Sequence, residues 1–227
     1  MKPQHVPCTV VFDLDGTLID SAPDLAGALN RLLVQYERPP VRLPEVRTMV
    51  GDGAVALIQR GFGRSGGLDG ISVERLRIRF LELYVDQMTA ETCLFPGAEA
   101  TLQALGEQGC RMALCTNKPA GMAEEILQYF GIRGRFAAVL GGDSLAVRKP
   151  DPLHLSSTIK EAGGHVERAV MVGDSSADVT AARRAGGPSI AVSYGYSAEP
   201  VDGLGADVVA HQLDEIPDLL VRLGVLG

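Results

Sequence analysis

Short apolar runs that alternate with amphipathic stretches constrain the fold of this sequence more than any other feature. Five of these runs are rich in valine, alanine and other apolar residues, as buried strands are, and they cover residues 9–12, 111–115, 137–140, 169–172 and 189–192, with residues 207–210 as a short sixth. Four helical patterns, each followed by the glycine that commonly ends a helix, cover residues 99–108, 122–130, 152–162 and 177–185. This alternation predicts an α/β fold in which a parallel sheet carries helices on both faces.

The stretch from about residue 21 to residue 92 breaks the alternation, because its pattern is almost wholly helical. Leucines mark one helix face over residues 25–33, a second helix is expected around residues 55–58, and a longer third over residues 73–88. A loop over residues 60–70 contains five glycines. A helical block inserted directly after the first strand predicts a cap domain. We expect the cap over residues 19–92 and a catalytic core over residues 1–18 and 93–227, with hinges near residues 18–21 and 92–96.

The composition excludes several classes of function. Apolar residues make up 46% and charged residues 22%, which is typical of a globular protein rather than a disordered one. The formal net charge of −7 argues against nucleic-acid binding, which usually needs a basic face. No apolar run approaches the length of a membrane span, and the first residues lack the apolar segment of a signal peptide. We therefore expect a cytoplasmic protein without a membrane partner, either a monomer or a homodimer.

The four cysteines do not indicate a metal site. They form no Cys-x-x-Cys pair, and no histidine lies near them at zinc-binding spacing. We expect reduced thiols, with Cys8, Cys110 and Cys115 in or beside strands and Cys93 in a connection.

Two aspartates, Asp13 and Asp15, follow the first apolar run. Residues two apart in an extended chain point the same way, so both carboxylates are expected at the carboxyl edge of the sheet, where open α/β sheets bind ligands. Two adjacent anions favour a bound cation, and oxygen ligands suit Mg²⁺. Gly16 allows a turn, and the amides around Gly16 and Thr17 are candidate donors to phosphate oxygens.

Polar residues also follow the second apolar run and precede a later helix. Thr116 offers a hydroxyl and Asn117 an amide, while Lys118 is either a ligand or a residue that leads into the next helix. Lys149 precedes Pro150 and is therefore held extended, and its ammonium is suited to neutralise both a phosphate and a carboxylate.

Asp174 and Asp178 flank the start of the helix that follows the fourth apolar run. Asp174 is placed to bind a metal ion. Asp178 lies four residues further on, and we expect it to reach the metal, its waters or Lys149. Helix capping is the alternative role for either aspartate.

These motifs together resemble those of the haloacid dehalogenase-like hydrolase superfamily in order and spacing, and the resemblance covers essentially the whole chain. The motifs are Asp13-Leu14-Asp15-Gly16-Thr17, then Thr116-Asn117, then Lys149-Pro150, then Gly173-Asp174 with Asp178. The resemblance implies a Rossmann-like core with a helical cap, and a Mg²⁺-dependent phosphatase that acts on a small phosphorylated metabolite. Weaker features in residues 50–54, 116–119 and 193–196 are similar to those of the phosphoglycolate phosphatases and imply 2-phosphoglycolate as the substrate.

The same resemblance implies roles for the residues. Asp13 attacks phosphorus and forms an aspartyl phosphate, and Asp15 protonates the leaving group and then activates water. Mg²⁺ is held by Asp13, Asp174 and the backbone carbonyl of Asp15. Thr116, Lys149 and nearby amides hold the phosphate oxygens.

The remaining expected site residues lie around that centre. Asp178 acts from outside the metal's direct ligands, and Asn117 with the amides of Gly16 and Thr17 binds substrate. In the cap, Gly51 and Gly53 contact the substrate, while Asp52, whose charge would repel an anion, points away or belongs to a plain interhelical turn.

Several alternatives differ in how well they fit. A haloacid dehalogenase is disfavoured by Asp15, which such enzymes typically replace, and a phosphonate hydrolase is disfavoured because residues 21–92 contain no lysine. A two-component receiver domain lacks such a cap, and a non-catalytic phosphate-binding module would be expected to lack one of the acids. A β-phosphoglucomutase-like isomerase, and a phosphatase for sugar phosphates, nucleotides or pyrophosphate, remain open.

Overall fold

Six parallel strands form one sheet in the order β5-β4-β1-β6-β7-β8. The computed structural model describes residues 7–226. The strands are β1 (Thr9–Phe12), β4 (Arg111–Cys115), β5 (Phe136–Leu140), β6 (Ala169–Gly173), β7 (Ser189–Val192) and β8 (Val208–Ala210). The predicted parallel α/β sheet is confirmed, and each strand lies within one residue of its expected bounds. The first strand of the chain is central, between β4 and β6.

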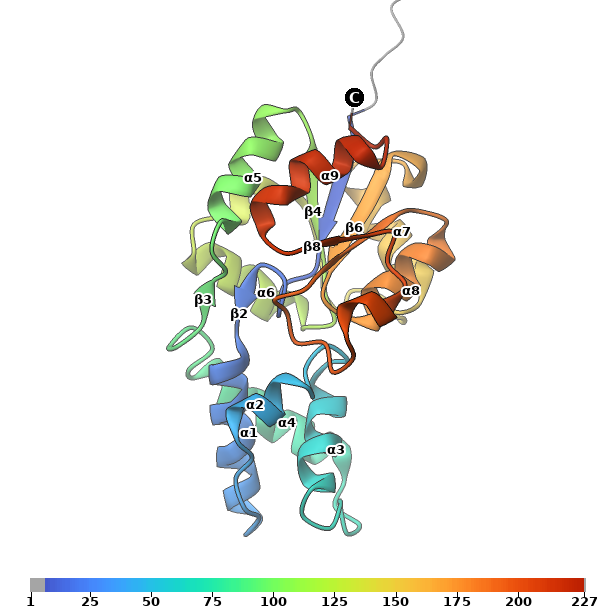
Figure 1. Cartoon of the computed structure of the whole chain (residues 1–227). Coiled ribbons are helices and arrows are strands. Elements are labelled where there is room, and N and C mark those ends of the chain that lie inside the picture. The colour runs from blue at the N-terminus through green and yellow to red at the C-terminus, as the bar shows by residue number, and fades with distance from the viewer. Residues whose placement is uncertain (1–6, 227) are drawn as a thin grey trace, which may run out of the picture.

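Helices cover both faces of this sheet, as predicted (Figure 1). They are α5 (Ala98–Glu107), α6 (Ala120–Tyr129), α7 (Pro152–Glu161), α8 (Ser176–Ala185) and α9 (Ile216–Arg222). Alternate residues of β1 belong to different hydrophobic clusters, one on each face of the sheet. Val10 and Phe12 lie in the cluster that includes α5, α6 and α9, whereas Val11 lies in the cluster that includes α7 and α8. This sheet with its five helices is the core lobe. Short 3-10 turns complete it at Arg133–Arg135, Val166–Arg168, Val201–Leu204 and Leu213–Glu215.

The helical block forms a second lobe, which lies below the core lobe in Figure 1. This helical lobe comprises α1 (Ala22–Gln35), α2 (Leu43–Arg47), α3 (Ala54–Gly63) and α4 (Val73–Val85). The three expected helices are present, and the short α2 was not predicted. The expected glycine loop over residues 60–70 is wrong in its first part, because α3 continues through Gly63. Gly61 allows α3 to pack closely on α1, since a Cβ there would lie 2.9 Å from a methyl carbon of Leu29.

The chain crosses between the lobes twice, and the two crossings pair with each other. The strands β2 (Ile19–Asp20) and β3 (Cys93–Leu94) are antiparallel, with Ile19 opposite Leu94. The predicted hinge segments therefore lie side by side, and Cys93 belongs to a strand rather than to the expected connection. The buried carboxylate of Asp24 reinforces the pairing by accepting hydrogen bonds from the Thr92 amide at 2.8 Å and hydroxyl at 2.7 Å. The exact division into domains stays a prediction.

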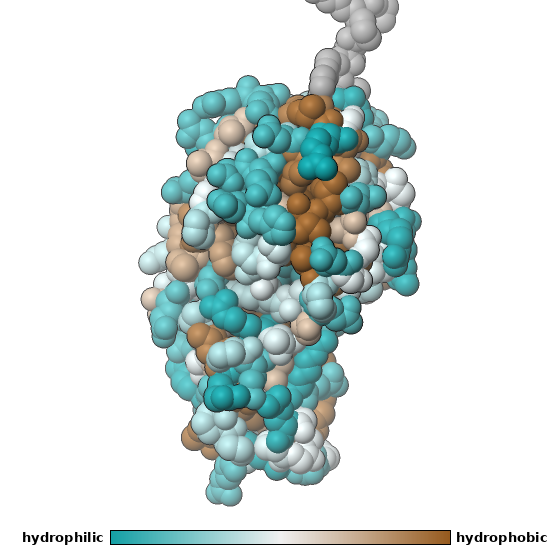
Figure 2. Space-filling view, viewed as in Figure 1, coloured by the Kyte–Doolittle hydropathy of each residue, from teal (hydrophilic) through white to brown (hydrophobic). Residues whose placement is uncertain are grey.

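The surface of the core lobe carries a band of hydrophobic residues on the side where α9 lies, whereas the visible face of the helical lobe is mainly hydrophilic (Figure 2). Val221 of α9 is 57% exposed. Over residues 7–226, no helix combines the length and the apolar character that crossing a membrane requires.

Candidate active site

The predicted polar residues meet at the carboxyl ends of the central strands. Asp13 follows β1, Thr116 follows β4 and Asp174 follows β6, and these three strands are neighbours in the sheet. Lys149 arrives from the loop after β5, and Asp178 from the first turn of α8. All five side chains are buried. The sheet order thus joins residues that lie up to 165 positions apart in the sequence.

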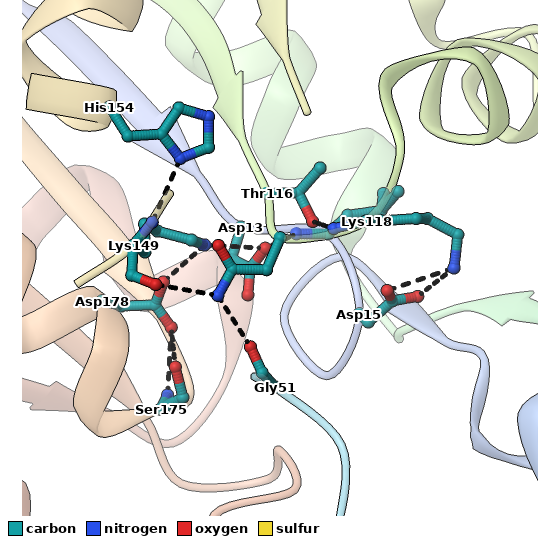
Figure 3. A network of polar contacts seen from close by, with 11 residues as sticks. Asp13, Asp15, Gly51, Thr116, Lys118, Lys149, His154, Ser175 and Asp178 are labelled. Carbon is teal, nitrogen blue, oxygen red and sulfur yellow. Dashed lines mark hydrogen bonds and ion pairs between the residues drawn. The ribbon is translucent and has the colours of Figure 1, made fainter. Parts of the chain in front are cut away.

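Lys149 forms the centre of one polar cluster (Figure 3). Its Nζ lies 2.9 Å from Asp13 Oδ1 and 2.6 Å from Asp178 Oδ1. The other oxygen of Asp178 accepts hydrogen bonds from the Ser175 hydroxyl at 2.6 Å and the Ser175 amide at 3.1 Å. Burial opposes the charge of Lys149, but the Asp13 and Asp178 carboxylates outweigh it and raise the lysine pKa. We call Asp13, Lys149, Ser175 and Asp178, together with the adjacent Asp174, the Lys149 cluster.

Three carboxylates in this cluster are suited to a metal ion. Oxygens of Asp13, Asp174 and Asp178 all lie within 4.8 Å of one another. Burial, with neighbouring carboxylates, raises the pKa of Asp13 to about 6 and that of Asp174 well above its ordinary value. Asp174 Oδ1 is buried and has no hydrogen-bond partner in the described part of the chain.

The charges and donor atoms both fit a divalent cation. Three ionised carboxylates against one ammonium leave a surplus of two negative charges, which a divalent ion would balance. An all-oxygen donor set suits Mg²⁺. An oxygen of Asp178 lies within 4.8 Å of the oxygens of Asp13 and Asp174, so Asp178 is a candidate metal ligand as well. From the sequence, we expected it outside the direct ligands. The Asp15 carboxylate is not part of this group.

Glycines make room for Asp174. A Cβ on Gly16 would lie 2.2 Å from Asp174 Oδ2, and one on Gly195 would lie 2.2 Å from Asp174 Cβ. Gly16 also has a φ of +84°, which favours glycine.

The amides of Gly16 and Thr17, which we expected to donate to phosphate oxygens, donate to backbone carbonyls instead. The Gly16 amide donates to the Ile19 carbonyl at 2.9 Å, and the Thr17 amide donates to the Leu14 carbonyl at 3.2 Å. These two donors therefore close the turn and are not free to bind phosphate in this conformation.

Tyr196 links the same acid to the crossing between the lobes. Its amide donates to Asp174 Oδ2 at 2.6 Å, and its hydroxyl donates to Asp20 Oδ1 at 2.6 Å while accepting from the Ala22 amide at 3.0 Å. Arg47 pairs with the other oxygen of Asp20 at 2.7 Å. In the sequence, Tyr196 stands out only as part of the weaker feature at residues 193–196, and nothing there predicts its link to Asp174.

A second cluster forms around Lys118 and lies apart from the first in Figure 3. Lys118 Nζ donates to both carboxylate oxygens of Asp15, at 2.9 and 3.1 Å, and to the hydroxyl of Tyr84 at 2.8 Å. The Ser21 hydroxyl donates to Asp15 Oδ1 at 2.5 Å. Burial raises the pKa of Tyr84 to about 12. We call Asp15, Ser21, Tyr84 and Lys118 the Lys118 cluster.

Sequence reasoning left the role of Lys118 open and missed Ser21 and Tyr84. The position of Lys118, two residues after Thr116 at a strand end, was the available signal. Nothing in the local pattern of α4 marks Tyr84 as a site residue.

Asn117 connects the lobes through backbone carbonyls. Its side-chain amide donates to the carbonyls of Gly51 and Lys149, both at 3.1 Å. Gly53 lies close by, since a Cβ there would be 3.4 Å from the Asn117 carbonyl oxygen. Asp52 pairs instead with the guanidinium of Arg60. The loop of residues 50–54 therefore reaches the core lobe with its glycines, while the Asp52 charge is compensated elsewhere.

A pocket of about 490 Å³, including its open mouth, lies between the two lobes. The core lobe supplies a polar floor of Asp13, Asp15, Thr116, Asn117 and Lys118. The helical lobe supplies a mostly apolar wall of Leu25, Val50, Ala54, Leu57, Phe80, Leu81 and Tyr84 together with Gly51 and Gly53. Such a pocket can hold a small molecule whose polar end meets Asp13.

Comparison with known proteins identifies the family of this chain. The sequence model of the family described as haloacid dehalogenase-like hydrolase matches residues 9–186. A phosphoglycolate phosphatase from Caulobacter vibrioides is 43% identical over 216 residues, which cover 95% of this chain and 91% of that protein. A phosphoglycolate phosphatase from Rhodospirillum rubrum is 41% identical over 220 residues, with the same coverage of 95% and 91%.

A solved structure is similar along most of its length as well. The crystal structure of a predicted phosphoglycolate phosphatase from Haemophilus somnus 129PT has a TM-score of 0.87 and 32% sequence identity. The similarity covers 94% of this chain and 97% of that one.

Proposed function

This chain belongs to the haloacid dehalogenase-like hydrolases and is a phosphatase, and from that premise we propose that it hydrolyses 2-phosphoglycolate to glycolate and inorganic phosphate. The observation that carries the proposal is the position of Asp13. Its carboxylate lines the pocket, contacts Lys149 and lies within 4.8 Å of two further carboxylates. The names of the relatives support the choice of substrate.

In the proposed reaction, Asp13 is the nucleophile. A carboxylate oxygen forms a bond to phosphorus while the bond between phosphorus and the ester oxygen breaks, which leaves an aspartyl phosphate. Asp15 gives a proton to the departing ester oxygen and then takes one from the water that hydrolyses the aspartyl phosphate. Its carboxylate suits this separate role because Ser21 and Lys118 hold it away from the acids around Asp174.

The other core residues bind and balance charge. Lys149 and Thr116 hold the phosphate oxygens, and Asp178 keeps the Lys149 ammonium in place through its 2.6 Å contact. Asp13 and Asp174, with the backbone carbonyl of Asp15, would hold Mg²⁺. That ion, when bound, supplies positive charge that offsets the phosphate and the clustered carboxylates.

The helical lobe completes the pocket in this proposal. Gly51 and Gly53 lie at the pocket wall beside Asn117, where they limit the size of the leaving group. The apolar wall excludes bulk water from the reacting carboxylates. We also propose that the protein acts in the cytoplasm on this small metabolite.

Phosphate release from a panel of small esters in the presence of Mg²⁺ tests the proposal. The panel comprises 2-phosphoglycolate, sugar phosphates, a nucleoside monophosphate and pyrophosphate. We expect the highest kcat/KM with 2-phosphoglycolate. A higher value with a bulky sugar phosphate would contradict the substrate assignment, and conversion of one sugar phosphate into another without phosphate release would indicate an isomerase.

A further inference from the structure

Lys118 is the one cationic side chain among the described residues that line the pocket. The other charged residues there are Asp13 and Asp15, which are both acidic. The Lys118 side chain is only 3% exposed, although it belongs to the pocket floor. A buried ammonium facing a ligand pocket is a recognition element for an anionic group.

The hydrogen bonds around Lys118, as far as the structure describes the chain, leave the hydroxyl proton of Tyr84 without an acceptor. Lys118 donates to Asp15 and to the Tyr84 hydroxyl, so that hydroxyl acts as an acceptor. Within residues 7–226, no acceptor receives a hydrogen bond from Tyr84, whose side chain is buried. An anion entering beside Lys118 would accept this hydroxyl proton, and it would accept a lysine N–H in place of one of the two hydrogen bonds that Lys118 makes to Asp15.

The position of Asp15 defines which part of the substrate reaches Lys118. The ester oxygen must lie near Asp15 to receive its proton, and Lys118 contacts the same carboxylate at 2.9 Å. In 2-phosphoglycolate the carboxylate oxygens are separated from the ester oxygen by two carbons, a span of roughly 3–4 Å. That span brings the carboxylate to the Lys118 ammonium while the phosphate stays at Asp13.

The rest of the wall offers little to a second anion. Leu25, Leu57, Phe80 and Leu81 from the helical lobe and Met122 from the core lobe are apolar. A carboxylate against these side chains alone would lose its hydration without compensation. Figure 3 shows the Lys118 ammonium on the side of Asp15 away from the Lys149 cluster.

We propose that Lys118 and Tyr84 recognise the carboxylate of the leaving group and so determine the specificity of this phosphatase. The inference rests on the proposed function and deepens it. Lys118 shares its hydrogen bonds between Asp15 and the substrate carboxylate, and Tyr84 donates from the helical lobe. Recognition of the correct leaving group therefore needs both lobes.

A pair of substrates tests this inference. Ethyl phosphate keeps the two-carbon leaving group of 2-phosphoglycolate but lacks its carboxylate. For Lys118→Met, we expect kcat/KM to fall about 100-fold more for 2-phosphoglycolate than for ethyl phosphate, because a charged hydrogen bond is lost only with the former. For Tyr84→Phe, the corresponding difference is about 5-fold to 10-fold. Arg79→Met is the control, since Arg79 lies on the same helix, is exposed and does not line the pocket.

An equal loss with both substrates would overturn the inference, because a lysine that only positions Asp15 affects every ester alike. Lys118→Arg keeps the charge and is expected to restore part of the preference. Should Lys118→Met fail to fold, the ratio of kcat/KM for 2-phosphoglycolate to that for ethyl phosphate is measured in Lys118→Arg and Tyr84→Phe instead. An unchanged ratio in both variants would overturn the inference. Inhibition by glycolate supplies a readout without turnover, and we expect it to weaken about 100-fold in Lys118→Met.

The failure of the proposed substrate is a separate result. If the wild type has a higher kcat/KM for another carboxylated ester, such as phospholactate, than for 2-phosphoglycolate, and prefers that ester over its uncharged counterpart, the substrate assignment fails and the inference stands. If the wild type prefers no carboxylated ester over its counterpart, the inference fails even for an active phosphatase.

Discussion

The Lys149 and Lys118 clusters both pair an aspartate with a buried lysine, but they recruit their partners from different parts of the molecule. Lys149 contacts Asp13 and Asp178, which both belong to the core lobe. Lys118 contacts Asp15 from the core lobe and Tyr84 from the helical lobe. The proposed phosphate end of the site is thus built within one lobe, whereas the proposed leaving-group end is complete only when both lobes are together.

The largest expected effect concerns Asp13, the proposed nucleophile in the Lys149 cluster. Asp13→Asn is expected to lower kcat by about 10⁴-fold or more for every ester, because an amide cannot form the aspartyl phosphate. Burial already raises the pKa of Asp13 to about 6, so the neutral side chain should leave the fold intact. Phosphate release and thermal unfolding measure the two effects. Asp69→Asn, an exposed change in the helical lobe, is the control, and retained turnover in Asp13→Asn would remove Asp13 as the nucleophile.

Lys149→Met tests whether the two lysines differ in the predicted way. We expect a loss of about 10³-fold in kcat/KM that is the same for 2-phosphoglycolate and ethyl phosphate, because the proposed role of Lys149 is to bind the phosphate common to both. The variant should also lose about 3–5 kcal/mol of unfolding free energy, since Asp13 and Asp178 lose their buried partner. Steady-state kinetics and urea unfolding measure these changes. A loss confined to the carboxylated substrate would reverse the roles of the two clusters.

Metal binding is expected to involve only the Lys149 cluster. A chelator should silence the enzyme reversibly, and Mg²⁺ at 100 times its Kd should raise the unfolding free energy by about 2.7 kcal/mol. Asp174→Asn should abolish that stabilisation, whereas Lys118→Met should retain it, because Lys118 contacts none of the three clustered carboxylates. Thermal unfolding with and without Mg²⁺ measures both variants. Full activity without any divalent ion would refute the metal assignment.

The smallest expected effect is the pH dependence that His154 adds beside Lys149. His154 is buried and accepts a hydrogen bond from the Lys149 amide at 3.3 Å. Burial, with the Lys149 charge, lowers the pKa of His154 from 6.5 to about 4. Between these values the unfolded chain binds more protons, so the stability that the neutral imidazole allows is lost as the pH falls from 6.5 towards 4.

We expect this loss to reach about 1–3 kcal/mol in the metal-free protein. His154→Asn keeps an acceptor near the position of Nδ1 and should flatten the profile of unfolding free energy against pH. Identical profiles for the wild type and His154→Asn would show that His154 does not titrate in this window.

The two lobes also differ in how far the sequence predicts them. The strands of the core lobe are continuous apolar runs because both of their faces are buried, so their positions are clear from the sequence to within one residue. Helix α2, with five residues, and the two-residue strands β2 and β3 are too short for a periodic pattern. Helix α9 was also missed, with seven residues and Pro217 near its start.

The same contrast holds within the site. The members of the Lys149 cluster follow strand ends, begin a helix or, for Lys149, lie in the loop after β5, and the order of parallel strands places all of them at one edge of the sheet. The contact between Lys118 and Tyr84 depends on how α4 lies over the core lobe, which no local pattern of residues encodes. The orientation of the Asp174 side chain could not be predicted from the sequence either, because it depends on the space that Gly16 and Gly195 leave open.

Tyr196 gives one of the clustered acids and the start of the helical lobe a common anchor. Its amide holds Asp174, and its hydroxyl holds Asp20 and Ala22, where the chain leaves the sheet. A redesign that shifts α1 to admit a bulkier ester would displace Tyr196 and, through its amide, the carboxylate of Asp174. Redesign of substrate range in this enzyme is therefore best confined to side chains of α3 and α4, with residues 19–22 left unchanged.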